Sequence, residues 1–214
     1  MLPDALTAIM LGALLGLRHA TDADHVVAVT AIVSRERSLG RAAWIGALWG
    51  IGHTLTLVVV GGAIVTFRLA IPPRVGLGLE FGVALMLILL GFANLRARDD
   101  APTERTAARP LLVGLVHGLA GSAAVALLVL ATIRGTFEAL AYLLVFGLGT
   151  IGGMIVVTVL LAAPAMYAGA RVVRLQRGIR LAAGAFSIAF GVLLARELIV
   201  EGGIFTASPT WAPR

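Results

Sequence analysis

Six long apolar segments, joined by short links that carry most of the arginines, are the feature that most limits how this chain can fold. They run at about 4–33, 42–67, 76–95, 110–133, 137–168 and 179–200. A helix needs about 20 mostly apolar residues to cross a bilayer, and every segment reaches that length. The sequence therefore predicts an all-α integral membrane protein with six transmembrane helices.

The composition agrees with this prediction and excludes several classes of protein. Hydrophobic residues make up 59% of the chain and charged residues only 13%, about half of what a soluble domain carries. All 17 basic residues are Arg and lie mostly in the links, so the basic balance indicates a lipid bilayer and no nucleic-acid partner. With no Cys, disulfides and thiolate metal sites are excluded.

The arginines also predict an orientation. If the N-terminus lies outside, the inner links hold eleven arginines and the outer side holds five, which favours N-out and C-out. The eleven are Arg35, Arg37, Arg41, Arg96, Arg98, Arg105, Arg109, Arg171, Arg174, Arg177 and Arg180.

The two halves of the chain resemble each other at a nearly constant offset of 97 to 100 positions. The matched pairs are Gly16–His19 with Gly114–His117, Trp49–Gly52 with Phe146–Gly149, and Leu90-Gly91 with Phe190-Gly191. A duplicated unit of three helices places its copies in opposite orientations, as in many secondary transporters. We expect a first repeat with the metal motifs at 1–98, a cytoplasmic linker at 99–109, a second, inverted repeat at 110–200 and an extracytoplasmic tail at 201–214.

The first segment holds an ionisable cluster: His19, Asp22, Asp24 and His25. Such groups are costly at membrane depth and indicate a functional site. On one continuous helix, His19, Asp22 and His25 would share an arc of about 120°, with Asp24 on the other side. Imidazole ligands suit nickel, cobalt, copper or zinc, whereas magnesium and calcium prefer oxygen. The alternative is a set of histidines that only make interhelical hydrogen bonds with aspartates.

Two more histidines lie within apolar segments. His53 follows Gly52 in the second segment, which we expect to pack antiparallel to the first and to bring His53 to the cluster. His117 in the fourth segment is the counterpart of His19, but Ala120 and Ser122 replace the two aspartates. The sequence leaves open whether His117 is a ligand, and whether Asp22 or Asp24 instead accepts the second ring N–H of a ligating imidazole.

These motifs carry a family resemblance. His19–His25 resembles the HX4DH signature of the nickel/cobalt transporter family, and Gly52-His53-Thr54 resembles its second motif. The stretch from His117 to Ser122 and the short length are most similar to the six-helix UreH-like urease-accessory branch. The resemblance implies movement of Ni²⁺ or Co²⁺ across the cytoplasmic membrane, with His19, Asp24, His25 and His53 carried over from the family's motifs.

We therefore expect a secondary transporter and no enzyme, with Ni²⁺ or Co²⁺ as the substrate and no prosthetic group. The resemblance also favours uptake for urease or hydrogenase maturation over efflux, because exporters of the family often carry a His-rich loop and the linker here has no His. The alternatives of another class are a membrane-embedded mononuclear metalloenzyme and a scaffold for metallocentre assembly. Selectivity between the two metals, the coupling ion and the formation of a homo-oligomer stay open.

Overall fold

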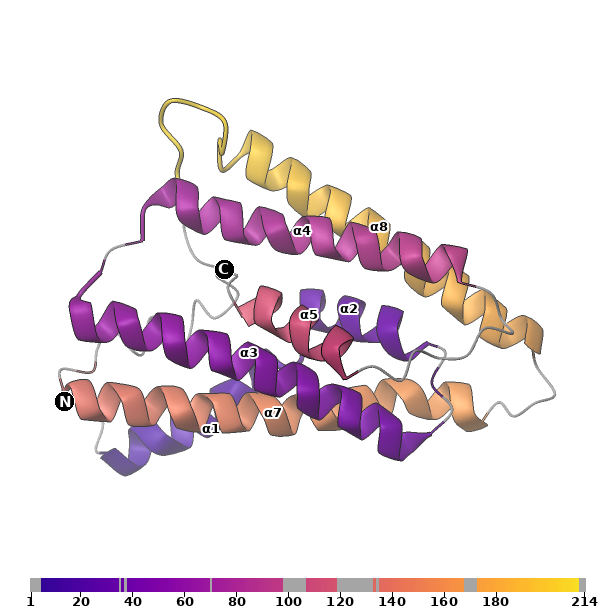
Figure 1. Cartoon of the computed structure of the whole chain (residues 1–214), viewed down its shortest axis with the longest axis horizontal. Coiled ribbons are helices and arrows are strands. Elements are labelled where there is room, and N and C mark those ends of the chain that lie inside the picture. Colours follow the sequence, from indigo (N-terminus) through magenta and orange to yellow (C-terminus); the bar gives the residue numbers. More distant parts are fainter. Residues whose placement is uncertain are drawn as a thin grey trace.

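A computed structural model describes residues 5–34, 36, 38–69, 71–97, 107–118, 133, 135–167 and 173–211. Within these residues every regular element is an α-helix (Figure 1). The helices are α1 (Ala5–His19), α2 (Ala23–Val33), α3 (Leu39–Phe67), α4 (Pro73–Arg96), α5 (Ala108–Gly118), α7 (Thr136–Tyr167) and α8 (Val173–Val200).

Local signals set the ends of the long helices. The Ser38 side chain accepts a hydrogen bond from the Arg41 N–H and so caps the start of α3. At the other end of α3, Arg68 adopts the left-handed conformation (φ 52°) and donates its N–H to the Ile64 carbonyl. Pro73 opens α4, where a missing backbone N–H costs nothing.

The helices form two packed groups with the short helix α2 between them (Figure 1). In the first group α3 lies along α7, α1 packs on α7, and α5 packs on α3; the second group is the pair α4 and α8. The residues in contact show that α1 runs parallel to α7 and α5 parallel to α3, whereas α3 and α7 are antiparallel. It follows that α1 and α5 run in opposite directions.

Glycines make these close approaches possible. A Cβ at Gly16 would overlap the Phe146 carbonyl oxygen, and one at Gly114 would overlap the Trp49 carbonyl oxygen. Gly91 and Gly191 give the same close approach between α4 and α8. Small residues that let backbones approach are the usual means of holding membrane helices together, because lipid supplies no hydrophobic driving force between them.

Four of the described helices are long and apolar enough to cross a membrane: Leu39–Phe67, Pro73–Arg96, Thr136–Ala163 and Arg177–Val200. Large apolar side chains also cover their outer surfaces, among them Phe137 (82% exposed) and Leu89 (68%). A soluble protein rarely exposes apolar surface on this scale. The protein is therefore a helical membrane protein.

The structure departs from the sequence prediction in two places, and a third part of the prediction falls on residues that it does not describe. The first apolar segment is broken between α1 and α2, so the continuous helix used to place the cluster is wrong. The α8 helix begins at Val173, so Arg174, Arg177 and Arg180 belong to a helix and not to an inner loop. The fourth segment is described only as far as Gly118, and most of the linker, like Ala120 and Ser122, lies outside the described residues.

Arg180 is buried because it joins a polar network between three helices. Its guanidinium donates to the Asn94 carbonyl (2.6 Å), and the Asn94 amide donates to the Arg180 carbonyl (3.1 Å) and to Ser34 Oγ (3.3 Å). Ser34 directly follows α2, Asn94 belongs to α4, and Arg180 belongs to α8. The network therefore ties the second helix group to α2.

Candidate metal centre

All four histidines converge at the centre of the molecule. His19 ends α1, His25 lies in the first turn of α2, His53 in the middle of α3, and His117 near the end of the described α5. All four side chains are buried. The His25 ring centroid lies 4.6 Å from that of His19, 5.3 Å from that of His53 and 4.1 Å from that of His117.

The chain break after His19 makes this convergence possible. Thr21 N–H and Asp22 N–H bond back to the carbonyls of Arg18 and His19, which tightens the end of α1. Asp22 then takes the N-cap position of α2 without capping it. Its carboxylate instead accepts a hydrogen bond from His19 Nδ1 (2.8 Å). The C-terminal end of α1, the negative end of its dipole, is thus directed at the cluster.

Asp24 joins two of the imidazoles and does not point away from them. Its Oδ1 accepts from His25 Nδ1 (3.0 Å) and from the His25 backbone N–H (2.9 Å). Its Oδ2 accepts from His117 Nε2 (2.9 Å). The single-helix prediction for Asp24 is therefore wrong, because the break lets α2 start in a new direction.

The carboxylates fix which ring nitrogens are free. An ionised carboxylate only accepts hydrogen bonds, so His19 Nδ1, His25 Nδ1 and His117 Nε2 carry the protons. A neutral imidazole then presents a lone pair on its other nitrogen. His25 Nε2 and His117 Nδ1 are buried and have no hydrogen-bond partner within the described chain. His19 Nε2 faces His53 Nε2 at 3.2 Å, and His53 Nδ1 likewise has no partner there.

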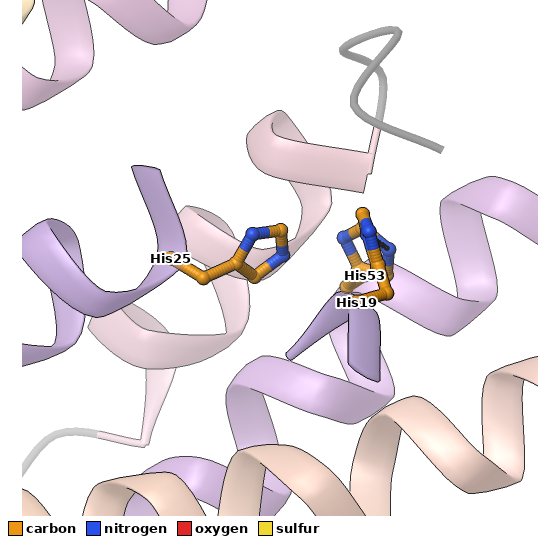
Figure 2. A group of neighbouring side chains, drawn as sticks. All are labelled: His19, His25 and His53. Atoms are coloured by element: carbon orange, nitrogen blue, oxygen red, sulfur yellow. Dashed lines mark hydrogen bonds between the residues drawn. The ribbon is translucent and has the colours of Figure 1, made fainter. Parts of the chain in front are cut away.

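Two overlapping groups of three side chains can each surround one cation. The first group is His19, His25 and His53, and Figure 2 shows the His25 ring directed at the other two rings. The second group is Asp24, His25 and His117. In each group, one ligand atom from every member lies within 4.8 Å of the others. His25 belongs to both.

Two buried aromatic rings, those of Trp49 and Phe146, border the cluster, although neither belongs to the metal motifs of the sequence. The Trp49 ring stacks near His25 (6.2 Å, 18° between planes), and the Phe146 ring lies 5.4 Å from His19. These aromatics occupy equivalent places in the two similar halves, 97 positions apart. The constant offset could therefore have identified these two aromatic residues as equivalent positions. Together they shield the cluster with apolar surface.

Comparisons with known proteins place this geometry in a family. No protein family model matches the chain. No solved structure matches it. The chain is 34% identical over 220 residues to the urease accessory protein UreH of Bacillus sp. (strain TB-90), across 94% of this chain and 96% of the relative. At that identity and coverage, the chain belongs to the UreH family of urease accessory proteins.

Proposed function

We propose that this protein is a secondary transporter that carries Ni²⁺, and also Co²⁺, inward across the cytoplasmic membrane. The observation that carries the proposal is the cluster of four buried imidazoles, each close to another, inside a helical membrane protein. Imidazole nitrogen suits first-row transition metals, and groups of this kind at membrane depth usually mark an ion pathway. The relative's name connects the family to urease, a use that fits nickel.

The first binding site in this proposal consists of His19, His25 and His53. A cation between His19 Nε2 and His53 Nε2 takes the place of the proton that they now share, and that proton moves to His53 Nδ1. The unpartnered His25 Nε2 supplies the third nitrogen. Asp22 and Asp24 then hold the far ring nitrogens and raise the basicity of the ligands.

We further propose that six membrane crossings arise as two inverted repeats, with the N-terminus and C-terminus outside. The contacts of Gly16 with Phe146 and Thr150 match those of Gly114 with Trp49 and His53. The matched positions are 97 or 98 apart in the sequence. If the two halves are exchanged, α3 takes the place of α7 and α7 that of α3, so the packed α3–α7 pair is unchanged. In this arrangement α1 and α2 together form one crossing, broken at the site as in many transporters.

The membrane potential is sufficient to drive uptake. A potential of 100 mV is worth about 2.3 kcal/mol per charge, hence roughly 4.6 kcal/mol for a dication. This supports roughly a thousandfold inward accumulation. Uptake in this proposal therefore needs no nucleotide.

The test is uptake of radiolabelled Ni²⁺ into proteoliposomes under an imposed inside-negative potential, with Co²⁺ as competitor. We expect potential-dependent uptake by the natural protein and none by His25→Ala, which removes the ligand common to both groups. Ser187→Ala, which removes a buried hydrogen bond to the Leu87 carbonyl between α8 and α4, two helices that carry none of the four histidines, serves as the matched control and keeps uptake. Full uptake by a folded His25→Ala variant would contradict the proposal. Transport in the outward direction only would show that the protein exports the metal and would contradict the proposed uptake.

A further inference from the structure

We propose a second cation site next to the first, formed by Asp24, His25 and His117, to which the metal passes during transport. This inference rests on the transport function proposed above and names the next position of the ion. It assigns His117 as a ligand of this second site and gives Asp24 two successive roles.

The second site offers three donors, of which the two imidazoles are fully buried and the Asp24 carboxylate is partly exposed. Asp24 Oδ2 lies 2.9 Å from His117 Nε2, and Asp24 Oδ1 lies 3.0 Å from His25 Nδ1. His25 and His117 are fully buried, and the centroids of their rings lie only 4.1 Å apart. One carboxylate with two imidazoles is a donor set that suits nickel, cobalt or zinc.

The shared His25 prevents both sites from being occupied together. A neutral imidazole has one lone pair, and its other nitrogen carries the proton. His25 can bind through Nε2 toward His19 and His53, or through Nδ1 toward Asp24, but not through both at once. The two sites are therefore alternative positions for one ion, and the five potential ligands should bind only one cation at a time.

The present hydrogen bonds determine which site fills first. A cation in the second site must displace two hydrogen bonds, those of Asp24 with His25 and His117. A cation in the first site displaces only the bond between His19 and His53, and His25 Nε2 has no hydrogen-bond partner within the described residues. A cation therefore binds first among His19, His25 and His53, and reaches the second site only when the bonds to Asp24 are exchanged.

The two sites take their ligands from different parts of the chain. His19 ends α1, and His117 lies near the end of the described part of α5, which runs antiparallel to α1. The first site takes all three ligands from the N-terminal half, on α1, α2 and α3, whereas the second takes His117 from the C-terminal half. A movement between the halves thus changes the distance between His25 and His117, which is the change required to release or accept the ion.

The experiment measures Ni²⁺ binding and Ni²⁺ flux on the same purified preparations. In equilibrium dialysis, the natural protein should bind one Ni²⁺ per chain. His117→Ala should keep that binding but lose flux by about 100-fold, since loss of a metal ligand costs more than loss of an indirect partner. Thr150→Val, a substitution on α7 that replaces a hydroxyl with a methyl group and removes its bond to the Phe146 carbonyl, is the control and keeps both.

A second arm isolates the new site. The double variant His19→Ala/His53→Ala should keep one weaker Ni²⁺, and addition of His117→Ala should remove it. Two Ni²⁺ per natural chain, loss of all binding in His117→Ala, or normal flux in His117→Ala would each overturn the second site. If the natural protein moves no Ni²⁺ at all, the transport proposal fails, and the double and triple variants still decide whether the second site binds metal.

Discussion

Helices α3 and α7 lie side by side in opposite directions and are packed alike, yet they carry different chemistry at equivalent positions. Gly114 on α5 meets the backbone of Trp49 and His53 on α3. In the same way, Gly16 on α1 meets the backbone of α7 at the two equivalent residues, Phe146 and Thr150. Where α3 has an indole and an imidazole, α7 has a phenyl ring and a hydroxyl.

The difference separates what packing requires from what the site requires. Close packing needs only a small residue at the crossing and tolerates any neighbour that fits. The site needs a second nitrogen opposite His19, and only α3 supplies one, at His53. Thr150 instead donates its hydroxyl to the Phe146 carbonyl of its own helix. The packing of the two halves is thus symmetric, and the candidate metal chemistry lies mainly in the first half.

The largest effect is expected where the packing is most alike. Gly16→Val and Gly114→Val should each abolish folded protein, because the new Cβ overlaps a backbone carbonyl that cannot move without separation of the helices. The yield of monodisperse protein in detergent measures this. Gly152→Val on α7 is the control, since a Cβ there meets no atom within 4 Å. Tolerance of one substitution and not of the other would show that the two crossings are not equivalent.

The next effect concerns the difference between the two helices. His53→Thr, which gives α3 the side-chain type of α7, should weaken Ni²⁺ binding by more than about 100-fold, since loss of even an indirect partner costs about 10–100-fold. Thr150→Val should leave binding unchanged. Calorimetric titration of the two folded variants measures both. Equal effects would mean that α3 and α7 contribute alike.

The carboxylates should have smaller and unequal effects. Asp24→Asn disturbs two imidazoles and should weaken Ni²⁺ binding by about 100-fold, whereas Asp22→Asn disturbs only His19 and should weaken it by about 10-fold. The same titration ranks them. If Asp22→Asn is the more severe change, Asp22 is itself a ligand and the assignment of its role is wrong.

Hydropathy and the repeated motifs predicted more of the architecture than of the site. The long apolar helices follow from composition, because a run of about 20 apolar residues has few other stable forms in lipid. The meeting of His19 with His53 was also predicted. The role of Asp24 was not, because it depends on the break at Ala20–Asp22, and the helical pattern continues through that break without Gly or Pro.

The sequence pattern also did not predict contacts between residues far apart in the chain. Glu80, an acidic residue within the third apolar segment, is buried and accepts a hydrogen bond from the Trp211 indole (2.8 Å). Trp211 packs on Gly76, so the C-terminal tail returns to α4. No local signal in the tail indicates this return, because it depends on a gap left by a glycine more than a hundred residues earlier.

The smallest effect is expected where α4 and α8 cross. Ser187 Oγ donates to the Leu87 carbonyl (2.8 Å), a buried bond between equivalent positions of the two halves. Ser187→Ala should lower stability by about 0.6 kcal/mol, the average for interhelical hydrogen bonds in membranes. Thermal unfolding in detergent measures the change. A change in Ni²⁺ affinity with this substitution would show that the crossing is coupled to the site.

The most direct test of the proposed site is X-ray absorption spectroscopy at the nickel edge on the Ni²⁺-loaded protein. The three-histidine site predicts the scattering pattern of three imidazole rings in the natural protein, of two in His53→Thr, and no change in Thr150→Val. A spectrum with only oxygen donors, or one that is the same in His53→Thr and the natural protein, would contradict the account.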